Sequence, residues 1–177
     1  MPATVVIAEQ NGLLASPVET LDIANINMGD SASAVLTPAT YPITAMADGH
    51  AYEKWLRFYV SAMGGSTVLD NFKVWLSSLG GGYKTGEGMS TNLRTSGYSA
   101  ASYPSGGPVK TNSAVATQVM PVAEPSGPNV GIGGLLAGTI TVAPVYTDWM
   151  VFQLDVTAST PAGALNQKTF TLQWDEQ

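Results

Sequence analysis

Few side chains in this sequence could act as an acid, a base, a nucleophile or a metal ligand. His50 is the single histidine among 177 residues, and cysteine is absent, which excludes disulfides, thiolate metal sites and cysteine nucleophiles. A serine hydrolase would need His50 as its base, and no GxSxG motif occurs. Because His50 follows Asp48-Gly49, a pair typical of a turn before a strand, we expect a structural role for it. We predict no catalytic residue, no cofactor and no metal ligand.

The carboxylates and glycines suggest three other kinds of site, namely a glycosidase pair, a calcium site and a phosphate- or dinucleotide-binding loop, but their spacing favours none of them. Asp70, Asp148 and Asp155 flank or lie on expected strands, where a pair could hydrolyse a glycosidic bond, although outward positions on a sheet also explain them. Four aspartates near Asn or Gly could bind a calcium ion in a loop: Asp22, Asp30, Asp48 and Asp70. The DxDxDG-like spacing of a calcium-binding loop is missing. The glycine runs at 80–88 and 131–134 lack the order of phosphate-binding and dinucleotide-binding loops, so we interpret them as loops or tight bends.

The aromatic residues are the remaining candidates for a binding site. The chain has four Trp and seven Tyr, and Trp75 and Trp149 are expected on the strand faces opposite the regularly spaced apolar residues. Such side chains can form a second core layer, anchor a protein interface or stack on sugars. We favour the core, with the protein interface and the sugar site as alternatives.

The composition narrows the class of partner. Charged residues make up 11% of the chain, against about 25% in ordinary soluble domains. The balance is acidic, with 13 Asp and Glu against 7 Lys and Arg that are scattered singly, which argues against binding to nucleic acid. The N-terminus lacks the pattern of a signal peptide, and no stretch approaches the length of a membrane span. We expect a surface suited to packing against other proteins, with no membrane partner.

The elements that must position these residues follow the period of a β-protein. Residues 148–158 alternate, with Met150, Phe152, Leu154 and Val156 on one side. Residues 168–175 alternate in the same way, and the segment between them contains Pro161 and Gly163. We predict that the two strands form an antiparallel hairpin with one buried face.

Further strands are predicted upstream. Residues 52–62 and 71–77 are rich in aromatic side chains and are separated by the sequence MGGS. A helix over 52–60 is the alternative, but the aromatic content and the following glycines favour a strand. Further strands are expected at 23–28 and 139–143, with weaker ones near Val5 and at 41–45. The resulting seven to nine strands predict an all-β fold, an antiparallel β-sandwich or jelly roll.

Two regions stand outside this regular pattern. Residues 1–20 have no evident pairing partner, and we interpret them as an N-terminal arm or edge strand beside a single β-sandwich domain over 21–177. Residues 80–108 are rich in Gly, Ser and Tyr, and we predict a long loop there. Loops of this length are usually functional or mobile, so both regions are candidate contact surfaces.

Several segments together resemble small structural proteins from the head and tail modules of tailed phages. The segments that carry the resemblance are 22–29 (DIANINMG), 50–58 (HAYEKWLRF), 70–75 (DNFKVW) and 173–176 (QWDE). The strand pattern to which they belong covers about half of the chain. The resemblance implies a non-enzymatic virion protein without catalytic residues that acts through an extended surface. The loop at 80–108 is not part of the family pattern.

These observations lead to one principal hypothesis. We expect a capsid decoration (cement) protein that binds the major capsid protein or other virion proteins, forms a homo-oligomer with a trimer favoured, and resides in the virion after assembly in the host cytoplasm. The alternatives are a tail, neck or baseplate protein and, from another class, a carbohydrate-binding or adhesin module; a glycan hydrolase ranks last. The predicted interface residues come from the arm and the long loop: Val5, Val6, Ile7, Leu13, Leu14, Tyr83, Tyr98 and Tyr103.

Overall fold

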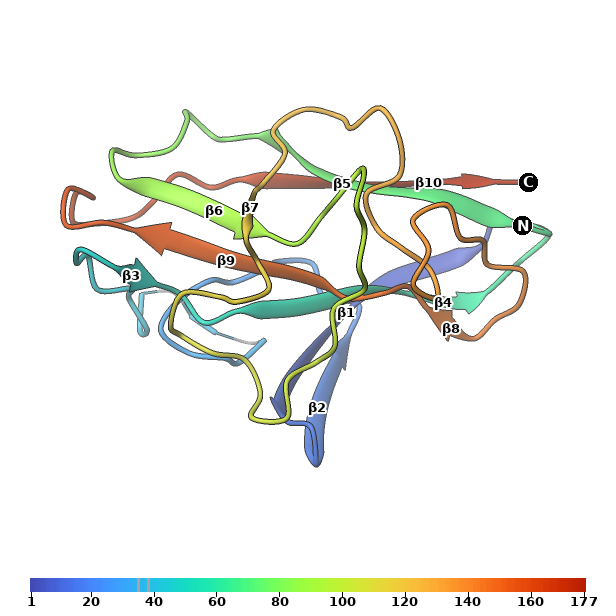
Figure 1. Cartoon of the computed structure of the whole chain (residues 1–177), viewed down its shortest axis with the longest axis horizontal. Coiled ribbons are helices and arrows are strands. Elements are labelled where there is room, and N and C mark those ends of the chain that lie inside the picture. Colours follow the sequence, from blue (N-terminus) through green and yellow to red (C-terminus); the bar gives the residue numbers. More distant parts are fainter. Residues whose placement is uncertain (35, 38) are drawn as a thin grey trace.

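The chain folds into two facing antiparallel β-sheets. This is seen in a computed structural model that describes residues 1–34, 36–37 and 39–177. The larger sheet has the strand order β2-β1-β4-β9-β6-β7, with β3 paired to β9 and β8 paired to β4, and the smaller sheet consists of β5 and β10 (Figure 1). The strands are β1 (Thr4–Leu13), β2 (Ser16–Leu21), β3 (Gly49–His50), β4 (Lys54–Ala62), β5 (Leu69–Ser78), β6 (Glu87–Thr91), β7 (Gln118–Val119), β8 (Val145–Tyr146), β9 (Met150–Val156) and β10 (Thr169–Glu176).

The main core lies between the two sheets, as the alternation of apolar residues predicts. Phe152 on β9 and Phe58 on β4 are buried in the same apolar cluster as Phe72 on β5. Phe58 and Phe72 meet edge to face with their ring centroids 5.0 Å apart. This layering confirms the predicted all-β sandwich, because apolar residues two apart on each strand fill the space between the sheets.

A second, smaller core covers the opposite face of the larger sheet. Trp55 and Val151 are buried there together with Tyr103 and Ala116 from the long connection between β6 and β7, and Trp149 packs against them. Both faces of strand β9 are therefore covered, whereas the predicted hairpin had one buried face. The preferred interpretation of Trp149 as part of a second core layer is confirmed.

The strongest pairing prediction is wrong. Residues 148–158 and 168–175 do form strands β9 and β10, but β9 pairs with β4, β6 and β3, whereas β10 pairs with β5. The connection at 157–168, which we expected to be a hairpin turn, instead carries the chain from one sheet to the other. Alternation defines which side chains share a face, and it does not identify the neighbouring strand.

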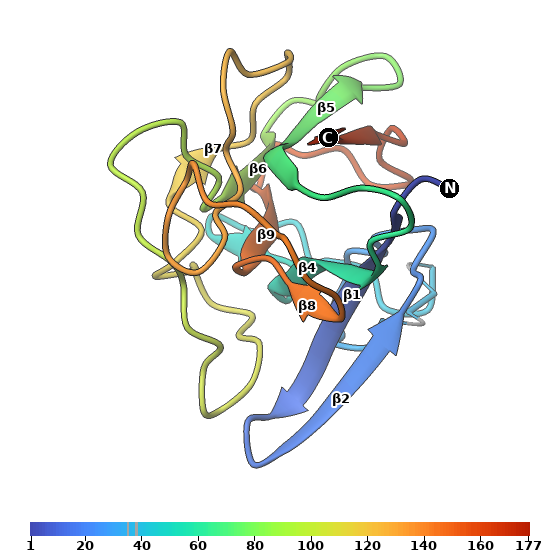
Figure 2. The ribbon, with the colours of Figure 1, turned by 90° about the vertical axis from the view of Figure 1, so that its right-hand side faces the viewer.

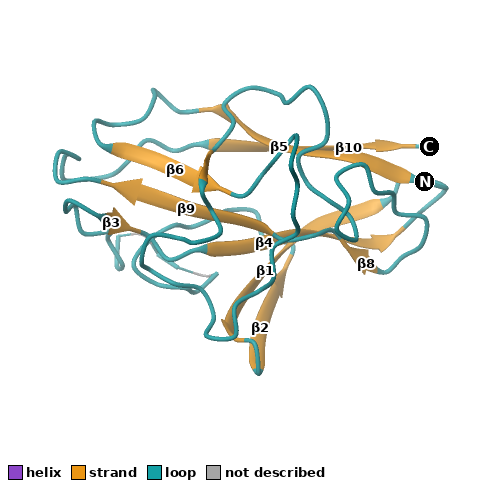
Figure 3. Cartoon of the chain, viewed as in Figure 1, coloured by secondary structure: helices purple, strands orange, loops and turns teal. Residues whose placement is uncertain are grey.

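Several predicted boundaries also change. Of the two interpretations of residues 1–20, an arm or an edge strand, the structure shows the second: β1 pairs with β4 along most of its length, and β2 forms the edge of the sheet. The segment 80–108 contains strand β6, so it is not one continuous loop (Figure 3). Residues 23–28 and 41–45 form no strand, and 139–143 contribute only a bridge between Ile140 and Leu69.

No helix in the described part of the chain is long and apolar enough to cross a membrane.

Candidate protein-interaction surface

The β1–β2 hairpin projects from the body of the sandwich (Figure 2). Leu13 pairs with Ser16, so Leu14 and Ala15 alone connect the two strands, and Asn11 pairs with Val18. Residues that pair across two strands share a face, and so do residues two apart along one strand. Leu13 and Val18 therefore lie on one face of the hairpin, next to its turn.

Three apolar side chains at the end of this hairpin are exposed to solvent. Leu13 is 55% exposed, Leu14 52% and Val18 59%, and we call these three residues the tip patch. Clustered apolar exposure at one end of a projecting element is typical of a contact surface, whereas single exposed apolar residues are ordinary. Strand β2 pairs only with β1 in the described part of the chain, so its outer edge could also accept a strand from a partner.

The hairpin is supported from one side by residues 103–107. The hydroxyl of Tyr103 donates a hydrogen bond to the Gly12 carbonyl at 2.7 Å, and the Leu14 amide donates to the Ser105 carbonyl at 3.2 Å. At Gly107, where φ is +77°, a Cβ atom would lie 2.5 Å from the Gly12 carbonyl oxygen. The backbone of this loop therefore packs directly against the end of β1, and only glycine fits at position 107.

A stack of Arg57 and aromatic rings supports the hairpin from the sheet side. The Arg57 guanidinium lies 3.6 Å from the centre of the Tyr146 ring and 4.1 Å from that of Trp149. Arg57 also binds the Glu19 carboxylate at 2.7 Å, and the Tyr146 hydroxyl donates to the same carboxylate at 2.7 Å. Because Glu19 belongs to β2, these contacts connect the edge strand to β4 across the face of the sheet.

Buried ionic groups attach the covering loop to the sheet. The Glu53 carboxylate accepts hydrogen bonds from Trp55 Nε1 at 2.8 Å, from Ser113 Oγ at 2.5 Å and from the Val109 amide at 3.3 Å. Beside Glu53 in the sequence, Lys54 forms an ion pair with Glu9, and both side chains are fully buried. The Glu53 contacts hold residues 109–113 against the sheet, whereas the Lys54–Glu9 pair joins β4 to β1 of the hairpin.

The predicted interface residues lie in three different environments. Leu13 and Leu14 are exposed in the tip patch, whereas Val5, Val6 and Ile7 are half-buried on β1, which pairs with β4. The three tyrosines point inward: Tyr103 is buried, and Tyr98 donates to Asp148 at 2.9 Å. Tyr83 packs against the main core, where burial, reinforced by the nearby carboxylates of Glu87 and Asp155, raises its pKa to about 12.

The structure thus separates supporting residues from contact residues. Burial, together with the charges of Glu53 and Glu9, raises the pKa of Tyr103 to about 12, so its hydroxyl stays protonated and can continue to donate to Gly12. We therefore assign Tyr103 to supporting the hairpin. The sequence analysis did not predict Val18 as a contact residue. Its position, five residues after Leu13 across a short turn, could have indicated that it lies beside Leu13.

His50 is held between two carboxylates. Its Nδ1 lies 2.7 Å from Asp155 and its Nε2 lies 2.8 Å from Asp48, while Ser90 Oγ donates to the other oxygen of Asp155 at 2.5 Å. Burial lowers the pKa of His50, but the hydrogen bonds and charges of Asp155 and Asp48 outweigh burial and raise it above its ordinary value of 6.5. A serine–histidine–aspartate triad places the imidazole between hydroxyl and carboxylate; here the carboxylate is in the middle, so His50 cannot accept the Ser90 proton directly.

The candidate calcium ligands do not assemble into one site. Asp30 binds Lys110 at 2.6 Å, Asp48 binds His50, and Asp70 accepts a hydrogen bond from the Gln177 side chain at 3.2 Å. Within residues 1–34, 36–37 and 39–177, no three acidic or histidine side chains are grouped closely enough to hold a metal ion.

Comparisons with protein-family models, with curated proteins and with solved structures found no match to this chain.

Proposed function

We propose that this protein is a non-enzymatic interaction module that docks onto another protein through the tip patch. The observation that carries the proposal is the exposure of Leu13, Leu14 and Val18 on a hairpin that is supported from two sides. A surface that is already held in one conformation loses little entropy when it binds. A supported apolar patch of this kind is therefore suited to docking.

The assembly that we propose is the outer shell of a tailed phage, with the chain acting as a capsid decoration protein. The low content of charged residues and the resemblance of about half of the sequence to phage structural proteins support this setting. Binding as a symmetric oligomer, with a trimer favoured, would present several tip patches at once. Several weak contacts would then act together through their high effective concentration.

The test removes the apolar side chains of the tip patch. A variant with Leu13→Ser, Leu14→Ser and Val18→Ser is compared with wild type for binding to purified phage shells that lack the chain. Each side chain is about half exposed, so its burial would contribute about 1 kcal/mol, and we expect the triple variant to bind roughly 100-fold more weakly. The control is Val122→Ser combined with Val142→Ser, which changes two valines that are 54% and 69% exposed in other loops.

Each outcome of this experiment is informative. Loss of binding in the tip variant alone supports docking through the hairpin, while equal binding by wild type and tip variant contradicts it. A count of hundreds of chains per particle by mass spectrometry would support a location on the shell. A count of a dozen or fewer would instead support a location in the tail, neck or baseplate. Binding to a glycan array that disappears on Trp75→Ala would instead support the carbohydrate-binding alternative, since Trp75 is only half-buried on β5.

A further inference from the structure

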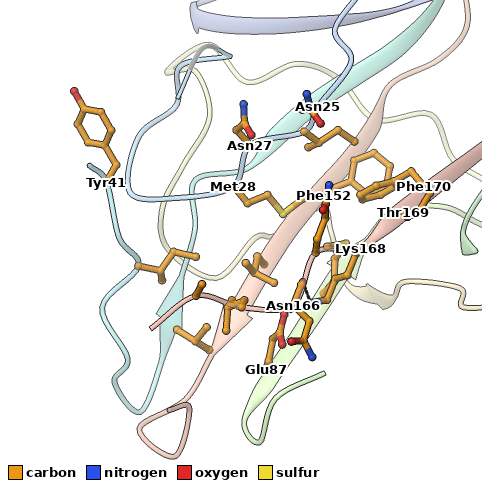
Figure 4. Close-up of a pocket in the computed structure, with 18 of the residues that line it drawn as sticks. Asn25, Asn27, Met28, Tyr41, Glu87, Phe152, Asn166, Lys168, Thr169 and Phe170 are labelled. Carbon is orange, nitrogen blue, oxygen red and sulfur yellow. Dashed lines mark hydrogen bonds and ion pairs between the residues drawn. The ribbon is translucent and has the colours of Figure 1, made fainter. Parts of the chain in front are cut away.

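A cavity of about 1050 Å³ lies inside the sandwich. Its walls come from both sheets, including Ile7 on β1, Leu154 on β9 and Phe170 on β10, and residues 23–28 and 160–168 also line it (Figure 4). Pockets that bind small molecules usually have volumes of roughly 300–1,000 Å³, so this cavity is large enough for a ligand.

The interior of the cavity is apolar and its lining is incompletely buried. Ile26 and Met28, from the segment that forms no strand, pack against the main core and yet remain partly exposed, as do Phe170 and Leu172 on β10. In Figure 4, Met28 lies on the same side of the cavity as Phe152 and Phe170. An apolar ligand would complete the burial of these side chains, which is favourable in proportion to the area removed from water.

The charged groups of the lining neutralise each other. Among the described residues around the cavity, Glu87 and Lys168 carry charge, and they form an ion pair with side chains that are 0% and 6% exposed. The second oxygen of Glu87 accepts from the Lys84 amide at 2.8 Å, and the Lys168 ammonium also donates to the Asn166 carbonyl at 3.0 Å. Both charges are already compensated, so an ionic ligand would find no free counter-charge.

The other polar side chains of the lining are uncharged amides and hydroxyls, and two of the amides, Asn25 and Asn27, lie on one segment. Asn25 is exposed and Asn27 is partly exposed on the lining segment 23–28. In Figure 4, Asn25 and Asn27 lie together on one side of the labelled residues, with Glu87 and Asn166 on the opposite side. An amide can both donate to and accept from a hydroxyl group, which suits a ligand with a hydroxyl at one end.

We propose that this cavity binds an uncharged molecule with a long hydrocarbon chain, of the class of fatty alcohols and monoacylglycerols. The hydrocarbon chain of the ligand lies between the two sheets against Leu154 and Phe170. Its hydroxyl end lies at Asn25 and Asn27. This site uses none of the tip-patch residues, so it is independent of the proposed docking function.

The test uses Nile red, an uncharged dye that fluoresces in apolar surroundings, with the purified 177-residue protein. Saturable binding of the dye is expected, and 1-dodecanol should displace it. Dodecanoate and dodecylammonium should compete about tenfold less well or worse, because their charges would be buried without a partner.

Two variants locate the binding in the cavity. Leu154→Trp fills the interior, and Ala164→Trp obstructs the lining from an exposed position outside the core. Each should weaken Nile red binding about tenfold or more, since each removes apolar contacts. The control Val142→Trp adds the same side chain at an exposed site outside the lining and should leave binding unchanged, as should Leu14→Ser in the tip patch.

The result has clear opposing outcomes. If Leu154→Trp does not fold, as judged by circular dichroism, the surface variant Ala164→Trp still tests the site. Absence of saturable Nile red binding by wild type, or binding that neither tryptophan variant weakens, would overturn the proposal. Equal competition by dodecanol and by the two charged ligands would overturn the assignment to uncharged molecules.

Discussion

Removal of the buried Lys54 ammonium offers a sensitive test of how β1, the inner strand of the hairpin, is attached to β4. Lys54 and Glu9 are 0% exposed, with Lys54 Nζ 2.9 Å from Glu9 Oε1. The ammonium also donates to the Ser33 carbonyl at 2.8 Å, while Glu9 Oε2 has no hydrogen-bond partner among the described residues. Lys54→Met keeps most of the apolar stem and leaves the Glu9 carboxylate buried without its counter-charge.

The magnitude of the effect follows from this burial. Breaking a buried ion pair by removing one partner costs about 3–5 kcal/mol of unfolding free energy. For a domain of this size each kcal/mol lowers Tm by about 2–4 °C, so the variant should melt about 6–20 °C below wild type. The double variant Glu9→Met with Lys54→Met should recover much of the loss, because no uncompensated charge then remains in the interior.

The assay is urea unfolding followed by tryptophan fluorescence, with Lys73→Met as the matched control. Lys73 is also largely buried, but its partner Glu124 is 53% exposed and can be solvated by water, so this pair should be worth less than about 1 kcal/mol. If Lys54→Met loses no more stability than Lys73→Met, the interpretation of the Glu9–Lys54 pair as a buried attachment is refuted.

Three further substitutions test other parts of the account. The folded-state pKa of His50 is raised, so the stability difference between wild type and His50→Gln should be greatest below pH 6.5 and should shrink as pH rises through the folded pKa. Urea titrations between about pH 5 and 8 measure this difference. A difference that stays constant with pH would contradict the prediction. Arg57→Lys removes the planar stacking on Tyr146 and Trp149, so hydrogen exchange of the backbone amides in β2 should accelerate. An unchanged exchange rate would show that the Arg57 stack does not support the hairpin. Gly107→Ala places a Cβ atom against the Gly12 carbonyl at a position where φ is positive. The substitution should lower the free energy of unfolding by about 1–3 kcal/mol, and an unchanged Tm would refute this.

The strands with clear alternation were predictable from the sequence, but their partners were not. Met150, Phe152 and Leu154 on β9 indicated one apolar face correctly, since these side chains lie in the main core. The same pattern could not show that residues 157–168 cross to the other sheet, because a turn with Pro and Gly fits either path. Strand β6 was missed since its sequence EGMST has little β-branched or aromatic character.

The segment at 23–28 shows the converse error. Its apolar residues indicated a strand, and Ile23 does donate from its amide to the Ile7 carbonyl at 3.2 Å. Ile26 and Met28 then pack against the core without joining either sheet. Burial of apolar side chains therefore accounts for the sequence pattern even though the segment does not form a β-ladder.

Only part of the candidate site could be found from the sequence. Leu13 and Leu14 were predicted as contact residues because they are apolar and lie in an N-terminal segment with no evident pairing partner. The contacts that support them join residues far apart in the chain, such as Glu19 with Arg57 and Gly12 with Tyr103. No local pattern specifies these pairs. Tyr98 and Tyr103 were assigned to the surface because their distant hydrogen-bond partners could not be known from the sequence.

Hydrogen–deuterium exchange of the free and shell-bound protein tests docking through the hairpin most directly. The account predicts that binding slows exchange of the backbone amides around Leu13, Leu14 and Val18, while the loop that carries the exposed Val142 exchanges equally in both states. Unchanged exchange in the hairpin, with protection appearing at another surface of the bound protein, would contradict the central claim.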